Sequence, residues 1–338
     1  MTAPLAHAPY AQLTPDLILT ALEQLGIRTS GHLLALNSYE NRVYQIGLDD
    51  DQQWGKFLVA KFYRPARWSD QQILEEHTFS KELAGYEVPV VAPIELSGNT
   101  LHSEQGFRFA LFPRRGGRSP ELDQRETREW IGRFLGRIHA VGQTQCFSER
   151  PTLDIQSYGH DSVAFLLGQQ FIPSDLQAAY QSVTAQALDA VEHCFARAGK
   201  VANVRLHGDC HASNILWTDA GPHFVDFDDA RNGPAIQDLW MLLSGERHEQ
   251  QAQLNDILYG YEDFMDFDPS ELHLLEALRT LRLLHYSAWL ARRWDDPAFP
   301  AAFPWFNTPI YWQNRILELR EQIALIAEGP LQSSSGNF

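Results

Sequence analysis

The stretch HGDCHASN at residues 207–214 constrains this chain more than any other part of its sequence. It runs into the apolar segment NILW, then a turn-like TDAGP, then HFVDFD. NILW and HFV have the length and composition of strands, and small polar residues with Gly and Pro are typical of a tight turn. The pattern predicts a polar loop that leads into a β-hairpin, with Asp226 at the end of its second strand.

His207, Cys210 and His211 raise the possibility of a zinc site, because His and Cys are the usual ligands of zinc. The other two cysteines, Cys146 and Cys194, are scattered, and no second cluster of His and Cys has ligand spacing. The favoured interpretation is therefore that His207 is a buried brace for the segment with Asp226 and that Cys210 packs as a small apolar residue. His211 has no assigned role.

A lysine interrupts the apolar run FLVAKFYR at position 61. Alone, Lys61 would be read as an edge-strand lysine whose amine reaches solvent. A buried lysine instead needs an anionic partner, because an unpaired buried charge is costly. Glu76 lies in the next expected helix, SDQQILEEHTFSKELAG, and a lysine paired to a helix glutamate is how kinases hold the α- and β-phosphates of ATP.

The polar loop fits the same chemistry. Asp209 and Asn214 are five residues apart, in the pattern H-G-D-x-x-x-x-N, which has the spacing of the kinase catalytic loop. At this spacing Asp209 would reach an acceptor hydroxyl, while Asn214 would bind a metal ion on the triphosphate. Asp226 is the expected second ligand of Mg²⁺, with Asp228 and Asp229 as rivals. These features together predict phosphoryl transfer from Mg²⁺-bound ATP.

The order of elements predicts an α+β chain with two lobes, like a protein kinase. The first part carries strand patterns (NRVYQIGL, KFLVAKFYR and FRFALFP) and helices at TPDLILTALEQLGIR and SDQQILEEHTFSKELAG. The later part carries amphipathic helices, among them RETREWIGRFLGRIHAVG. We expect a β-rich ATP-binding lobe at residues 1–115, a larger helical lobe with the catalytic loop at 116–328, and a flexible tail at 329–338.

Charge and hydropathy limit the partners. The formal net charge is -16 over 338 residues, which disfavours nucleic acid and anionic membranes. The N-terminus does not read as a signal peptide, and no apolar run has the length of a membrane span. We expect a cytoplasmic protein that is a monomer.

The motifs also resemble a known family. HGDCHASN and VDFDDARNGPAIQDLW are similar to the aminoglycoside and choline kinase-like phosphotransferases, whose fold is that of protein kinases. The similarity is closer to the bacterial stress response kinase A family and also covers LNSYENRVYQ, VAKFYRPARW, QILEEH and WLARRWDDPAFPAAFPW. This resemblance implies ATP-dependent phosphorylation of protein serine and threonine, autophosphorylation, and a protective role under stress.

The resemblance also implies roles for individual residues. Asp209 resembles the catalytic aspartate, and Asp226 is counted as an active-site residue besides being a magnesium ligand with Asn214. Lys61 and Glu76 resemble the ATP-phosphate lysine and its partner. The remaining two matches are Ser38, in the loop that would cover the phosphates, and Asp238, the buried aspartate that braces the catalytic loop.

Two departures keep an alternative open. SYENRVY, which holds Ser38, contains no glycine, so the flexible approach of a glycine-rich loop to phosphates is not available. Only DDARNGPAIQ separates Asp226 from the stretch with Asp238, which leaves no room for a long activation loop. A kinase that phosphorylates the hydroxyl of a small molecule, such as an amino alcohol, sugar or aminoglycoside, is therefore the alternative. A metallophosphoesterase would need further His and Asp motifs, and a pseudokinase would need a lost catalytic residue.

Overall fold

The computed structural model describes residues 9–332, which fall into two compact units. Two short segments that we expected in the helical lobe belong instead to the first unit. The first unit runs to Ser119 and also contains Asn214–Asp228 and Asp296–Ala298, and the second contains Pro120–Ser213, Asp229–Asp295 and the chain from Phe299 onward.

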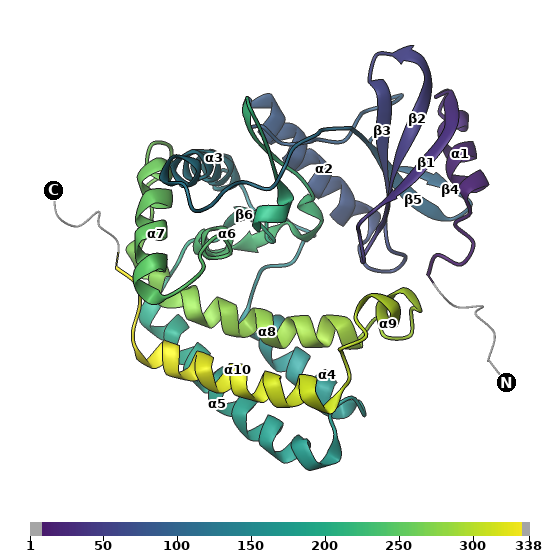
Figure 1. Cartoon of the computed structure of the whole chain (residues 1–338). Coiled ribbons are helices and arrows are strands. Elements are labelled where there is room, and N and C mark those ends of the chain that lie inside the picture. Colours follow the sequence, from purple (N-terminus) through teal and green to yellow (C-terminus); the bar gives the residue numbers. More distant parts are fainter. Residues whose placement is uncertain (1–8, 333–338) are drawn as a thin grey trace. The chain divides into compact units, whose positions relative to one another are not determined.

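The first unit is built on an antiparallel sheet of five strands in the order β1-β2-β3-β5-β4 (Figure 1). The strands are β1 (Thr29–Leu36), β2 (Arg42–Gln52), β3 (Gly55–Phe62), β4 (His102–Glu104) and β5 (Phe107–Pro113). β2, β3 and β5 confirm the three predicted strands. The sequence did not predict β1, because this edge strand is mostly exposed and has no alternating apolar pattern.

Two helices of this unit begin as their sequences indicate. In α1 (Pro15–Gln24), the Thr14 hydroxyl accepts a hydrogen bond from the Leu17 amide. In α2 (Asp70–Gly85), Ser69 and Gln72 form a capping box, in which each side chain bonds the backbone of the other.

The alternation of β3 decides where Lys61 points. Leu58, Ala60 and Phe62 are buried in the apolar core that α1 shares with the sheet. Lys61 has the opposite parity, so it leaves the other face of the strand, the face on which its neighbour Ala110 of β5 packs with Ile73 of α2. A lysine in the middle of the sheet is thus directed toward α2.

A β-hairpin completes the first unit, as the sequence predicted. Its strands are β7 (Ile215–Thr218) and β8 (Gly221–Phe224), and Ile215 pairs with Phe224. The prolyl segment before β4 runs extended beside this hairpin, since Val91 donates its amide to the Phe224 carbonyl. Asn214 and the chain after Phe224 are therefore held at the same end of the hairpin.

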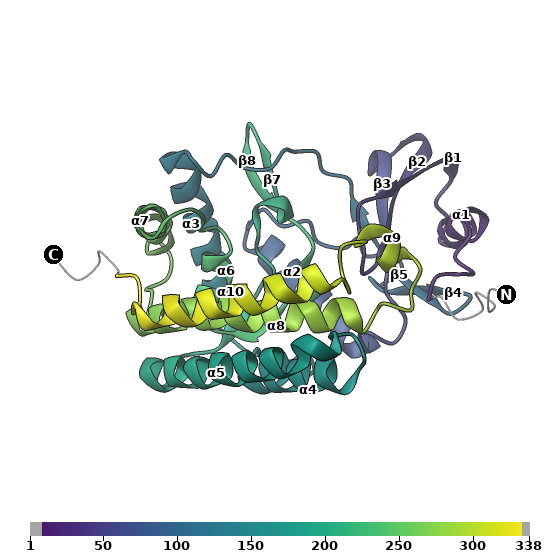
Figure 2. The ribbon, with the colours of Figure 1, turned by 60° about the horizontal axis from the view of Figure 1, so that its bottom comes forward.

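The second unit is mainly helical, and α5, α8 and α10 run side by side in it (Figure 2). A short antiparallel pair, β6 (Val204–Leu206) with β9 (Arg231–Gly233), brackets the catalytic-loop motif. The helices are α3 (Arg125–Gly142), α4 (Asp161–Gly168), α5 (Ser174–Ala198), α6 (Ile236–Trp240), α7 (Arg247–Tyr261), α8 (Leu275–Ala291) and α10 (Pro309–Ala327), with α9 (Ala298–Ala302), a π-helical turn at Gln156–His160 and a 3₁₀ turn at Pro269–Leu274.

The end of the described chain differs from the expected flexible tail. Arg247 of α7 donates to the carbonyls of Gly329 and Pro330, and Leu331 is buried. Residues 329–332 are therefore bonded to the second unit, while 333–338 lie outside the described residues. Within residues 9–332, no helix combines the length and the apolar character that crossing a membrane would require.

Candidate active site

Lys61 is buried in the first unit and lies among three carboxylates. Its Nζ is 2.9 Å from Asp226 Oδ1, 3.2 Å from Asp228 Oδ1 and 3.9 Å from Glu76 Oε1. The expected partner Glu76 is therefore present, at ion-pair distance, but both aspartates lie closer to the amine. The simple edge-strand interpretation of Lys61 is wrong, because its side chain is only 7% exposed.

The charge state of Lys61 follows from these neighbours. Burial alone lowers the pKa of a lysine, because it disfavours the charged amine. Here the carboxylates of Asp226, Asp228 and Glu76 outweigh burial and raise the pKa of Lys61 well above its usual value. Lys61 is thus a fixed cation, as a group that binds phosphate must be.

Asn214 and Asp226 lie at one end of the β7–β8 hairpin. The Asn214 carbonyl accepts a hydrogen bond of 3.0 Å from the Val225 amide, directly before Asp226. Asp226 has a φ of 62°, in the left-handed region that non-glycine residues seldom adopt. Its side chain is 51% exposed although its partner Lys61 is buried. One carboxylate oxygen contacts the lysine, and the group as a whole is still open to a ligand.

Asp209 lies in the second unit, in a loop whose backbone is hydrogen-bonded to the side chain of Asp238. The fully buried Asp238 accepts hydrogen bonds from the amides of His207 (2.8 Å) and Gly208 (2.9 Å). Its Oδ2 also lies 3.0 Å from Nε2 of His139 in α3. Gly208 has a φ of 85°, and a Cβ there would lie 2.1 Å from the Asp229 carbonyl oxygen. The expected brace by Asp238 is confirmed, and the motif needs its glycine for both reasons.

The Asp209 carboxylate has two cationic or polar neighbours. Arg282 of α8 places Nη1 2.7 Å from Oδ1, and His211 places Nε2 3.4 Å from Oδ2. Burial raises the pKa of Asp209, but the hydrogen bond from His211 and the charge of Arg282 outweigh it, so that the pKa is lowered. Asp209 is therefore ionised at neutral pH. His211, which had no role from sequence, lies against this carboxylate.

The histidine of α8, His285, is only a weak base. It stacks on Tyr158 of the π-helical turn with ring centroids 4.1 Å apart. Burial and the nearby Arg231 lower the pKa of His285 to about 3, so it is neutral near neutral pH and has little affinity for a further proton. Asp209 is the ionised acceptor in this part of the second unit.

The structure also bears on the metal question. His207 and Cys210 are fully buried, and His207 Nδ1 accepts a hydrogen bond of 3.3 Å from the Asp209 amide. No group of three or more His, Cys, Asp or Glu side chains among residues 9–332 is arranged to hold a metal ion by itself. A site for Mg²⁺ needs less from the protein, because one or two side-chain oxygens and the substrate phosphates complete its shell.

The predicted site residues thus fall into two groups. Lys61, Glu76 and Asp226 meet in the first unit, and Asn214 lies on the same hairpin as Asp226. Ser38 is half-buried in the turn between β1 and β2 of that unit.

Asp209 lies in the second unit with partners that sequence reasoning missed. Arg282 gave no signal in the apolar helix pattern of LRTLRLLHYSAWL. Asp228 was visible in VDFDD but was treated only as a rival of Asp226, and Arg67 was visible in VAKFYRPARW without a role.

Comparisons with known proteins agree with this arrangement. Residues 32–275 match the phosphotransferase enzyme family (APH). Stress response kinase A of Escherichia coli O157:H7 is 49% identical over 323 residues, which cover 96% of both chains. This chain belongs to the stress response kinase A family of phosphotransferases. Another member, the serine/threonine protein kinase RdoA of Salmonella typhimurium strain LT2, is 47% identical over 96% of both chains.

Solved structures show that the family fold is the expected one. An amicoumacin kinase, hAmiN, in complex with AMP-PNP, Ca²⁺ and Ami superimposes with a TM-score of 0.69 at 18% identity, covering 93% of this chain and 94% of that one. A microcompartment-associated aminopropanol kinase gives a TM-score of 0.69 at 17% identity over 92% and 97%. The α+β class, with a small antiparallel sheet and a larger helical part, is confirmed.

Proposed function

We propose that this kinase-family protein transfers the γ-phosphoryl group of Mg²⁺-bound ATP to serine or threonine of proteins, including itself, under stress. The observation that carries the proposal is the identity of 47–49% over nearly the whole chain to relatives named stress response kinase A and serine/threonine protein kinase RdoA.

The first unit would hold the nucleotide. Lys61, fixed as a cation, is suited to bind the phosphates, and Glu76 keeps a second negative charge near the amine. Asn214 and Asp226 supply an amide oxygen and a half-exposed carboxylate from one hairpin, which fits a hard cation with oxygen ligands. Such an ion, when bound, neutralises charge on the phosphates. Ser38 would contribute its hydroxyl from the turn that covers them.

The second unit would supply the acceptor side of the reaction. Asp209 is ionised and braced, so it can orient an acceptor hydroxyl and accept its proton. Rigid placement of this carboxylate matters because phosphoryl transfer depends on positioning more than on covalent chemistry.

A small-molecule hydroxyl kinase is the second candidate. It is favoured by the direct passage from Asp226 through β9 into α6, which leaves no separate loop to seat a peptide. The surroundings of Asp209 speak against one subclass, the polycationic acceptors. Arg282 and Arg231 balance Asp209 and Asp229 there, although the chain as a whole carries a net charge of -16. A site built for a polycation would carry an excess of carboxylates.

The test uses γ-labelled ATP, Mg²⁺, the purified protein and a generic protein acceptor, beside the Asp209→Asn variant. We expect label on serine or threonine of the acceptor or of the enzyme, and a loss of turnover by orders of magnitude in the variant. Binding of a nucleotide analogue should persist in the variant. Full activity of Asp209→Asn would refute the catalytic assignment. ATP consumption stimulated only by a small hydroxyl compound would identify the second candidate.

A further inference from the structure

The turn at residues 37–41 has no glycine, yet it stands where a kinase covers the phosphates, so something else must fix its shape. Its side chain Glu40 is 12% exposed and points into the first unit. Glu40 Oε1 lies 3.7 Å from Arg64 Nε and 3.9 Å from Arg67 Nε. The Glu40 carbonyl also accepts a hydrogen bond of 3.1 Å from the Tyr10 hydroxyl. The turn is therefore anchored through Glu40.

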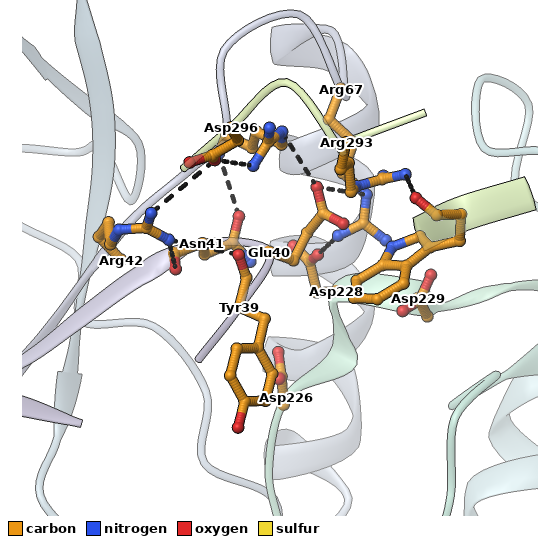
Figure 3. Close-up of polar contacts among 12 residues, drawn as sticks. Tyr39, Glu40, Asn41, Arg42, Arg67, Asp226, Asp228, Asp229, Arg293 and Asp296 are labelled. Carbon is orange, nitrogen blue, oxygen red and sulfur yellow. Dashed lines mark hydrogen bonds and ion pairs between the residues drawn. The ribbon is translucent and has the colours of Figure 1, made fainter. Parts of the chain in front are cut away.

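Arg67 connects this anchor to the lysine site. Its Nη1 forms an ion pair with Asp228 Oδ2, and the other oxygen of Asp228 lies 3.2 Å from Lys61 Nζ. Figure 3 shows Arg67, Glu40 and Asp228 grouped together. Lys61, Asp228, Arg67 and Glu40 thus form a chain of alternating charges. Each of these side chains is at most 12% exposed, so solvent screens the chain little.

The charge network also includes the residues directly after Glu40, through Arg64 and Asp296. Arg64 also binds Asp296, with Nη1 2.9 Å from Oδ2, and Arg42 Nη2 lies 3.9 Å from the same oxygen. The Arg64 amide donates to the Asn41 side-chain oxygen at 3.0 Å. Arg42 begins β2 directly after the turn. Residues 40–42, at the C-terminal end of the turn, are therefore tied to a set of charges that is mostly buried.

The two aspartates beside Lys61 differ in a way that matters for ligand binding. Asp226 is 51% exposed, whereas Asp228 is 5% exposed and has a second cation, Arg67. When a phosphate competes for Lys61, Asp226 can turn to another ligand at little cost. Asp228 would have to give up a buried ion pair with Arg67, which is costly. Asp228 is thus the permanent counter-ion of Lys61, and Arg67 keeps it in place.

We propose that Arg67 is a positioning residue for the nucleotide, which holds the glycine-free turn through Glu40 and the phosphate-binding Lys61 through Asp228. Charge pairing would then replace the usual glycine-rich loop with a turn that is already in its binding shape before ATP arrives. The inference rests on the proposed function in one respect, since it takes Lys61 and the turn as the phosphate-binding elements.

The experiment compares Arg67→Ala, Arg67→Lys, Glu40→Gln and the double variant Arg67→Ala/Glu40→Gln. Binding of Mg²⁺–AMP-PNP is measured by calorimetry, KM for ATP and for the acceptor are measured by label transfer, and the free energy of unfolding is measured in urea. Lys81→Ala is the control, because it removes an exposed ion pair with Glu95 in the same unit. Glu40→Gln keeps the side-chain shape, so it tests the charge even if Arg67→Ala does not fold.

We expect Arg67→Ala and Glu40→Gln each to weaken AMP-PNP binding and to raise KM for ATP by about tenfold or more, because small misplacements at such a site are costly. KM for the acceptor and AMP-PNP binding by Lys81→Ala should stay unchanged. The double variant should be little worse than Arg67→Ala, because that change already breaks the connection between Arg67 and Glu40. Arg67→Lys should restore part of the affinity, since a lysine can keep one of the two partners.

Suppose that the variants have a lower free energy of unfolding, but that their Kd for AMP-PNP and KM for ATP stay within about twofold of wild type. The role of Arg67 would then be merely structural, and the inference would be overturned. Absence of AMP-PNP binding by the wild type would also overturn it. The binding result does not depend on the identity of the acceptor, because AMP-PNP binding is measured without an acceptor. If the variants lose nucleotide affinity while only a small hydroxyl compound is phosphorylated, the inference stands and the protein-kinase proposal falls.

Discussion

Asp209 is kept ionised by the hydrogen bond from His211, two residues along the chain, and by Arg282, which lies far from it in the sequence. Arg282 contacts it from α8, and Asp238 holds its loop through two backbone amides. The groups that act on its charge come from three segments of the second unit: His211, Arg282 and Asp229. Of these, Arg282 is the fixed cation that contacts the carboxylate.

Arg282→Gln should therefore change the pH dependence of the reaction. In the proposed mechanism Asp209 acts in its ionised form, which exists above its pKa. Removing the nearby positive charge raises that pKa, so the acid limb of kcat/KM should move to higher pH and the loss should be largest at acidic pH. The measurement is kcat/KM from about pH 3.5 to about pH 8, a range that spans the ordinary carboxyl pKa of about 4.

Two further variants make this pH experiment specific. Arg282→Lys should restore most of the wild-type profile, because it returns a cation near Asp209. Arg279→Gln, one helical turn earlier, removes an ion pair with Glu276 and should leave the acid limb in place. An equal loss for Arg282→Gln at every pH would contradict the role assigned to its charge.

The close contact between α3 and α7 depends on glycines, which have no side chain to keep the two helices apart. Cβ atoms added at Gly132 and Gly136 of α3 would lie 2.1 and 2.4 Å from the carbonyl oxygens of Ile257 and Tyr261 in α7. One added at Gly260 of α7 would lie 2.0 Å from the Glu129 carbonyl oxygen. The two helices thus touch backbone to backbone. This contact also fixes α3, which carries His139 to the loop-bracing Asp238.

Gly136→Ala should therefore destabilise the protein. The added methyl must push the two backbones apart, which for overpacked sites costs about 1–3 kcal/mol, occasionally more. The free energy of unfolding in urea measures this cost. Gly168→Ala at the end of α4 is the matched control, because nothing lies within 4 Å of its Cβ position, and it should change stability by less than about 1 kcal/mol. Equal stability of both variants would contradict the close contact.

At the scale of the whole molecule, the chain passes from one unit to the other five times, at residues 119/120, 213/214, 228/229, 295/296 and 298/299. Consequently, no single continuous segment of the sequence contains the whole first unit. The hairpin with Asp226 and Asp228 is supplied about a hundred residues after the sheet, and Asp296 later still. Phe227 of the same segment packs edge to face on Phe79 of α2.

A fragment of residues 1–119 should for this reason fail to fold on its own. It would contain the strands of the five-stranded sheet but lack the two carboxylates closest to the buried Lys61, leaving only the more distant Glu76 of the three. Breaking a buried ion pair by removing one partner costs about 3–5 kcal/mol. Urea unfolding followed by circular dichroism should show no cooperative transition, in contrast to the full chain. A sigmoidal transition with a stable baseline would show that the sheet is an independent domain.

Much of the local structure could be predicted because its signals are local. Thr14 and Ser69 start their helices through hydrogen bonds to residues three positions along, and β3 and β5 are compact apolar runs. The edge strand β1 could not be predicted, since its residues bury little and its pairing with β2 depends on the sheet. Asp209, Asn214 and Asp226 were found because their spacing reflects one loop and one hairpin.

By itself, the sequence determined the helices and strands with strong local signals, the catalytic-loop motif and the family, because these depend on residues near each other or on a pattern that relatives share. Only the tertiary structure decided which charges meet. Asp226 and Asp228 lie closer to Lys61 than Glu76 does, Arg67 joins Asp228 to Glu40, and Arg282 reaches Asp209. Such pairs join segments far apart in the chain. Burial sets their strength, and burial is a property of the folded molecule.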